Sequence, residues 1–158
     1  LEQTVNKTQE IAFFLAKEKA FFIAEKNANN FVIGSDQMLI FEDKILSKVT
    51  SKSEAENRLK TFSGKTHSLI SSVCVIKDGN ILWSFTDIAH LTMREMSLSS
   101  LKNYINKSGD VLTKCVGCYA LEGLGIQLFQ TIKGDFFTIL GMPLLPLTHF
   151  LQSKGVGL

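Results

Sequence analysis

The feature that most constrains the fold is the apolar stretch 31–41, which is interrupted near its middle by the polar residues Gly34-Ser-Asp-Gln37. Its length and its apolar flanks predict a buried β-strand. A carboxylate inside such a strand is disfavoured by strand propensity and by desolvation, so Asp36 needs a partner, a metal ion or a local turn. Two interpretations follow: Asp36 hydrogen bonds a turn within the strand, or it is a catalytic carboxylate.

The rest of the pattern predicts one α/β domain over residues 1–158 with a mixed central sheet, because a hairpin signal and helix-separated strands both occur. Residues 8–27 are apolar on nearly every side, which predicts a well buried helix. Further helices are expected after a capping box, Ser53-Glu-Ala-Glu56, after Ser97 and at Pro143. The expected strands are 31–41, 44–46, 69–77, 81–93, 126–132 and 136–140, with turns at Glu42-Asp43 and Asp78-Gly79.

Composition argues against several classes of function. The net charge is only +2 and the chain has two arginines, so nucleic acid is not an expected partner. No signal peptide or bilayer-spanning apolar segment is visible, and we expect no membrane association and a cytoplasmic location. Three cysteines argue against a disulfide framework. The pair Cys115-Val-Gly-Cys118 lacks the second pair of a zinc site, so small buried residues near a loop are favoured over metal or redox chemistry.

Several short motifs together resemble the Maf family of nucleoside triphosphate pyrophosphatases, which are also called septum formation inhibitors. Each motif is weakly specific alone, but their order and spacing are specific, and they cover the chain from Leu15 to the last helix. The motifs are Gly34-Ser-Asp-Gln37, Leu46-Ser-Lys48, Leu59-x-x-Phe-Ser-Gly-Lys-Thr-His67, Gly117-Cys-Tyr-Ala-Leu-Glu-Gly123, Gly134-Asp-Phe-Phe137 and Gly141-Met-Pro143.

The resemblance implies a mixed-sheet fold with two lobes around a cleft, as in Maf and inosine-triphosphatase-like proteins. It implies cleavage between the α- and β-phosphates of a nucleotide with a divalent metal cation, Mg²⁺ or Mn²⁺, and it suggests a homodimer. Asp36 matches the family's active-site carboxylate, and it could bind the metal or accept a proton from water. Lys19 and Lys48 match phosphate-binding lysines. His67 is interpreted as a structural histidine at the start of a strand in preference to a catalytic one.

The resemblance also selects Lys19 over Lys17. Two residues apart on a helix, these side chains point about 200° away from each other, so they cannot both face one site. The family's Gly-Lys-Pro loop is Ser47-Lys48-Val49 here, which keeps the charge of the loop and removes the stiffening proline.

Two positions indicate the substrate branch. The chain has Asp36-Gln37 and Glu122-Gly123, as well as Cys115 before Val116-Gly117, which look like the 7-methyl-GTP branch rather than the dTTP and UTP branch. Guanine presents adjacent N1–H and N2–H donors that one carboxylate can accept, whereas uracil and thymine present one donor between two carbonyls. We expect Gln37 and Glu122 to bind substrate. The alternatives for Glu122 are a surface loop residue or a second metal ligand.

One departure from the family pattern concerns the start of the chain. The family begins with a strand that leads into a Ser-x-Ser-Pro-Arg-Arg phosphate loop, followed by an Asp-Glu pair, and neither occurs in these 158 residues. We expect that the segment has been omitted from the sequence, because a domain without this central strand should fold poorly. The other interpretation is a non-catalytic nucleotide-binding remnant.

Overall fold

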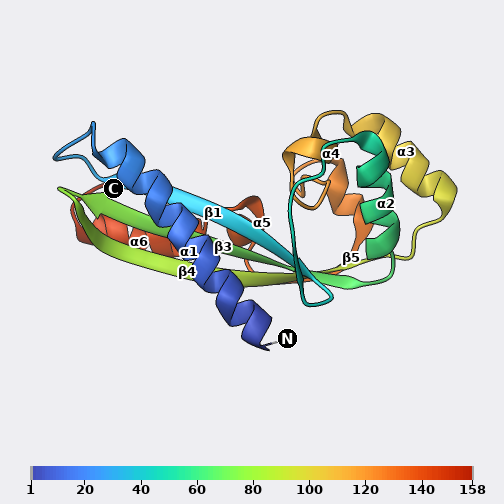
Figure 1. Ribbon diagram of the computed structural model, residues 1–158, viewed down its shortest axis with the longest axis horizontal. Helices are drawn as coiled ribbons and strands as arrows, with labels where there is room; N and C mark the ends of the chain where they lie inside the picture. The colour runs from blue at the N-terminus through green and yellow to red at the C-terminus, as the bar shows by residue number, and fades with distance from the viewer. Residues whose placement is uncertain (1, 158) are drawn as a thin grey trace. The chain divides into compact units, whose positions relative to one another are not determined.

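The computed structural model describes residues 2–157, which form an α/β fold with a five-stranded sheet and helices packed against it (Figure 1). This confirms the expected fold class. Hydrogen-bonded neighbours in the sheet follow the order β2-β1-β3-β4-β5. The elements are α1 (Glu2–Ala24), β1 (Val32–Phe41), β2 (Lys44–Leu46), α2 (Lys52–Phe62), β3 (Thr66–Lys77), β4 (Asn80–Met93), α3 (Leu98–Ser108), α4 (Val111–Lys114), the 3₁₀ helix η1 (Leu124–Leu128), β5 (Phe129–Lys133), α5 (Phe136–Leu140) and α6 (Leu144–Ser153).

The chain divides into two compact units. Unit 1 contains residues 2–38, 70–88 and 134–157, and unit 2 contains Leu39–Leu69 and Ala89–Lys133. The boundaries cut through β1, β3 and β4, so each of these strands contributes residues to both units.

Across residues 2–157, no helix has both the length and the apolar character needed to cross a membrane.

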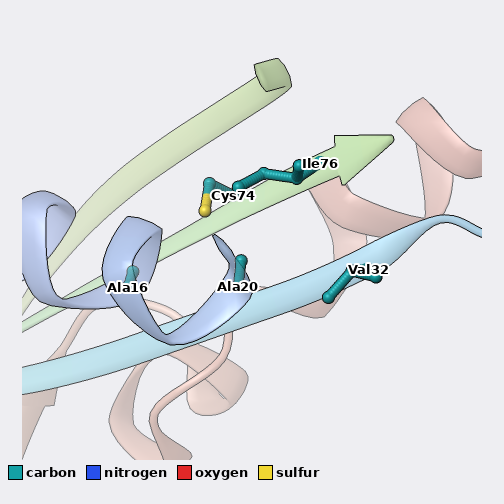
Figure 2. Close-up of a cluster of buried hydrophobic side chains, with 5 residues drawn as sticks. All are labelled: Ala16, Ala20, Val32, Cys74 and Ile76. Carbon is teal, nitrogen blue, oxygen red and sulfur yellow. The ribbon is translucent and has the colours of Figure 1, made fainter. Parts of the chain in front are cut away.

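In unit 1, α1 packs closely on β1 and β3 through small side chains. Figure 2 shows Ala16 and Ala20 of α1 facing Val32, Cys74 and Ile76 of the two strands. Gly34 lies in the same contact, because a Cβ atom at this position would come within 2.2 Å of the Ala16 carbonyl oxygen. Residues 32, 34 and 36 share one face of the strand, so this close approach also brings α1 next to Asp36.

The prediction of a helix buried nearly all round is wrong for α1. Its buried residues are Thr8, Ala12, Ala16 and Ala20, one on each successive turn. Phe22 is 67% exposed, and Phe14 and Ile23 are exposed as well. The strand approaches so closely that only small residues fit between the two backbones, while Phe13 and Phe21 pack at the edge of the contact and remain partly exposed. The helix also begins at Glu2, well before the predicted start at residue 8.

The opposite face of β3 is covered by α6. Val73 and Val75 pack with Leu147, while Cys74 and Ile76 pack with α1. Because successive residues of a strand point to opposite faces, β3 is buried on both sides over this stretch. This explains why the strand is almost continuously apolar instead of alternating.

Unit 2 begins with the tight turn that the sequence predicts between its first two strands, followed by a capped helix. Glu42 and Asp43 both have positive φ, 48° and 62°, and they connect β1 to the antiparallel strand β2. The start of α2 differs from the prediction, because its N-cap is Ser51 and not Ser53. The Ser51 hydroxyl accepts from the Glu54 N–H, and the Glu54 carboxylate accepts from the Thr50 N–H at 2.8 Å. The capping box thus lies two residues earlier.

Two of the predicted strands are wrong in whole or in part. Residues 126–128 belong to η1, and β5 begins only at Phe129. Residues 136–140 form α5 instead of a strand, because the Asp135 carboxylate accepts hydrogen bonds from the N–H groups of Phe137 and Thr138. A run of Phe, Thr, Ile and Leu has strand propensity, but the side-chain cap and the left-handed Gly141 after it favour one short helix.

His67 is buried in unit 2, with 1% of its surface exposed. Its Nε2 hydrogen bonds the Tyr119 hydroxyl at 2.7 Å, and its ring stacks on Phe62. Among residues 2–157, His67 Nδ1 is the buried side-chain polar atom that has no hydrogen-bond partner. Burial lowers the pKa of His67 from 6.5 to about 4. These contacts favour the structural interpretation of this histidine.

The low pKa of His67 predicts a pH-dependent free energy of unfolding. Between about pH 6.5 and pH 4 the unfolded chain binds a proton at this position and the folded chain does not, so stability falls as the pH is lowered. The loss over the whole window is about 3 kcal/mol. Urea unfolding of the wild type and of His67→Gln at several pH values measures it. In His67→Gln the free energy of unfolding should no longer depend on pH in this way. A substitution of the exposed His90 should leave that pH dependence unchanged.

Candidate functional site

In unit 1, Asp36 lies at the middle of β1 and has Lys19 of α1 as its partner. The Lys19 ammonium donates a hydrogen bond to Asp36 Oδ1 and a second, at 3.3 Å, to the carbonyl oxygen of Ser35. The Asp36 side chain is 15% exposed and that of Lys19 is 59% exposed. The desolvated carboxylate is therefore compensated by a cation that remains partly in water.

Lys17 lies elsewhere on α1, as the helical spacing requires. Its ammonium approaches the Glu18 carboxylate at 3.7 Å and lies over the Phe14 ring. The structure therefore brings Lys19, and not Lys17, to Asp36.

Asp36 retains an oxygen that can bind a further group. Within residues 2–157, Lys19 is the one side chain that hydrogen bonds this carboxylate, and it does so at Oδ1. Over the same residues, no group of three or more His, Cys, Asp or Glu side chains is arranged to hold a metal ion. The donor set therefore fits a hard cation that takes one protein carboxylate and obtains its other ligands from phosphate oxygens and water, as Mg²⁺ commonly does.

Gln37 points to the opposite side of β1 and binds α5. Its Nε2 donates to the hydroxyl of Ser71 at 2.9 Å and lies 3.0 Å and 2.9 Å from the carbonyl oxygens of Thr138 and Ile139. The Thr138 hydroxyl in turn donates to Asp87 Oδ2 at 2.7 Å. The amide nitrogen of Gln37 is thus occupied within unit 1, and only its oxygen is left for a ligand.

In unit 2, Lys48 and Glu122 are both exposed, and both act on the thiol of Cys115. The pKa of this thiol is raised, mainly by burial and further by the Glu122 carboxylate, while the Lys48 ammonium opposes the rise. A cation and a carboxylate from distant parts of the sequence therefore both lie within electrostatic reach of one half-buried thiol.

Lys48 also lines an open pocket of about 490 Å³ between β2 and α2, together with Lys44, Glu54 and Arg58.

Arg58 is a functional candidate that the sequence did not single out. It lies on α2 and donates hydrogen bonds to two backbone carbonyls, of Ser47 and of Val116, the second at 2.8 Å. A sequence does not show which backbone carbonyls a side chain will bind. The one sequence feature that could have drawn attention to Arg58 is the scarcity of arginine in the chain.

The C-x-x-C pair fits the expectation of small residues near a loop. Cys115 and Cys118 are free thiols, and Cys118 is buried in a turn where its N–H donates to the Cys115 carbonyl. Burial raises the pKa of Cys118 to about 11, so this thiol is a poor nucleophile and a poor metal ligand at neutral pH.

Comparison with known proteins gives consistent matches over most of the chain. The family model described as Maf-like protein matches residues 2–154. The chain is 42% identical over 147 residues to a nucleoside triphosphate pyrophosphatase of Nitrobacter hamburgensis, an alignment that covers 93% of this chain and 73% of that protein. It is 45% identical over 146 residues to a 7-methyl-GTP pyrophosphatase of Brucella suis, covering 92% and 73%, and 44% identical over 154 residues to one of Bartonella quintana, covering 98% and 78%.

Proposed function

Because the chain belongs to the Maf family, we propose that it is a nucleoside triphosphate pyrophosphatase, an enzyme that hydrolyses the bond between the α- and β-phosphates to give a monophosphate and pyrophosphate. The observation that carries the proposal is the pair of Lys19 and Asp36 in unit 1. It holds a cation next to a carboxylate that keeps one oxygen free, a pair of groups suited to the hydrolysis of a phosphoric anhydride.

Asp36 and Lys19 have separate tasks in this proposal. Attack at phosphorus needs a water molecule whose position is fixed and whose proton can leave, and the free oxygen of Asp36 is an acceptor for that proton. Lys19 is a mobile point charge on a partly exposed stem, so its ammonium can exchange Asp36 for a phosphate oxygen of the substrate. Lys48, in unit 2, is a second exposed cation suited to phosphate.

We also propose a divalent cation, Mg²⁺ or Mn²⁺, with Asp36 as its protein ligand. The oxygen that Lys19 leaves free would hold it, as the alternative to accepting the proton of the water. When bound, it would supply positive charge that stabilises the phosphate oxygens during cleavage. Free nucleoside triphosphates are abundant in the cytoplasm, and we place the enzyme there.

For the substrate, we propose 7-methyl-GTP. Glu122 is exposed in unit 2, and its two oxygens match the adjacent N1–H and N2–H donors of guanine. Methylation at N7 places positive charge on the ring, which strengthens these donors toward a carboxylate. The relatives named 7-methyl-GTP pyrophosphatase support this choice. The oxygen of Gln37, which the fold leaves uncommitted, is a further acceptor for substrate.

The test is the cleavage of 7-methyl-GTP, GTP, dTTP and UTP, with products identified by chromatography. We expect 7-methyl-GMP and pyrophosphate, with the highest kcat/KM for 7-methyl-GTP. Glu122→Gln should lower kcat/KM for 7-methyl-GTP by about 1–3 kcal/mol of transition-state binding, because a charged hydrogen bond is lost, and should affect dTTP and UTP much less.

Glu56→Gln is the matched control, since Glu56 pairs with Lys60 on the surface of α2 and should not alter any of the four rates. A wild type that prefers dTTP or UTP would contradict the substrate assignment. Release of orthophosphate in place of pyrophosphate would contradict the reaction itself. An equal loss on all four nucleotides in Glu122→Gln would assign Glu122 to the phosphates or the metal.

A further inference from the structure

Arg58 joins two loops of unit 2 that lie far apart in the sequence. A single terminal nitrogen, Nη1, donates to the carbonyl of Ser47 in one loop and to the carbonyl of Val116 in the other. This nitrogen carries two hydrogens, so each carbonyl can receive one of them. Arg58 is half-buried as a residue and its bond to Val116 is partly shielded from water, and hydrogen bonds from a charged donor are among the stronger ones.

The two carbonyls adjoin the groups proposed to bind substrate. Ser47 directly precedes Lys48, and Val116 directly follows Cys115 in the segment that leads to Glu122. Lys48 and Glu122 both lie close enough to Cys115 to act on its thiol. Arg58 therefore holds the backbones on which the candidate phosphate-binding cation and the candidate base-binding carboxylate are carried.

The helix that carries Arg58 is itself well anchored. The helix α2 is capped by Ser51 and Glu54, and it buries Ala55, Leu59 and Phe62. Its side chain at position 58 thus projects from a fixed support toward two loops that contain no regular structure at residues 47–49 and 116–118.

We propose that Arg58 is a positioning residue that sets the separation of Lys48 and Glu122 by bridging their loops, an inference that rests on the proposed function. Arg58 touches neither the phosphates nor the base in this proposal. It acts through backbone carbonyls, so its removal lets the two loops move independently and weakens substrate binding more than the chemical step.

Hydrogen exchange of Arg58→Met, compared with the wild type, tests the bridge without any substrate. The reporters are the amide of Thr50, which donates to Glu54, and the amide of Cys118, which donates to the Cys115 carbonyl. We expect both to exchange at least about 10-fold faster, while the amides of α2 are unchanged. Lys60→Met, which removes a cation from the same helix without touching either loop, is the control.

Faster exchange in only one loop, or in neither, would overturn the bridge. Faster exchange throughout α2 would overturn it as well, because Arg58 would then stabilise the helix in general. These outcomes do not depend on activity, so the bridge can stand or fall even if the protein cleaves no nucleotide.

Steady-state kinetics then test the link to substrate. In Arg58→Met the KM for 7-methyl-GTP should rise about 10-fold or more with kcat changed less than about threefold, since ground-state binding is lost. A loss of kcat at constant KM would overturn the positioning role, because that pattern reports a smaller fraction of folded enzyme. If the wild type itself cleaves none of the nucleotides, the proposed function fails and only the hydrogen-exchange result remains to judge the bridge.

Discussion

Asp36→Asn is expected to lower the rate of pyrophosphate release by about 10²–10⁴-fold, the usual effect of removing a positioned acid–base group. Asparagine has nearly the same shape, and its amide oxygen can still accept a hydrogen bond from Lys19. It has no negative charge to accept a proton from water or to hold a cation. The fold should therefore persist while turnover is lost, which circular dichroism and a pyrophosphate assay measure together.

The matched control is Asp110→Asn. Asp110 is also paired with a lysine, Lys114 at 2.9 Å, but this pair lies exposed at a short helix of unit 2. Its loss should leave the rate unchanged, because an exposed pair contributes little and Asp110 has no proposed role. Pyrophosphate release close to normal in Asp36→Asn would remove Asp36 from the mechanism.

Gly34→Ala is expected to destabilise the protein by about 3 kcal/mol and to lower activity in the fraction that folds. The new Cβ atom would meet the Ala16 carbonyl oxygen at 2.2 Å and the Ala20 nitrogen at 2.8 Å. Both are backbone atoms, so no side-chain rotation relieves the overlap and α1 must move away from β1. Because Lys19 is on α1 and Asp36 is on β1, the same movement separates that pair.

Gly123→Ala is the control for this substitution. A Cβ atom there would meet only the Ala120 carbonyl oxygen, at 3.7 Å, and its φ of −120° suits any residue. Urea unfolding of the two variants gives the free energies. Equal stability in Gly34→Ala and the wild type would show that the close packing of α1 on β1 is not required.

Local sequence signals predicted the elements whose causes lie within a few residues. The strand 31–41 and the two turns at Glu42-Asp43 and Asp78-Gly79 depend on apolar runs and on residues that tolerate positive φ, and all three were correct. Ser97 caps α3 as predicted, because its hydroxyl accepts from Ser100, three residues away. Such contacts can be recognised from spacing alone.

The errors arose where a distant partner or a competing local signal decided the outcome. The face that α1 buries is set by Gly34 of β1, which places alanines against the strand and leaves Phe14 and Phe22 exposed. The residues of α5 favour a strand by propensity, but Asp135 caps them as a helix, and Gln37 binds the carbonyls at its end. The second contact joins positions about a hundred residues apart, so no local pattern contained it.

The candidate site, too, was predicted from local sequence only in part. Helical spacing separated Lys17 from Lys19, but only the family resemblance chose between them, and the structure then placed Lys19 on Asp36. The roles of Asp36, Lys19, Gln37, Lys48 and Glu122 in binding and catalysis stay predictions. Arg58 escaped notice because its acceptors are backbone carbonyls, which every residue possesses.

The burial of β3 on both faces has a consequence for the protein during its synthesis. Cys74 and Ile76 of β3 can pack against α1 as soon as they are synthesised, because α1 leaves the ribosome before β3 does. Val73 and Val75 pack beside Phe31 and Trp83, but they must wait for Leu147 of α6 to cover them. A nascent chain that has emerged through β4 therefore lacks the α6 cover of this face of β3, and such incompletely covered apolar surface binds molecular chaperones and favours aggregation when translation stalls.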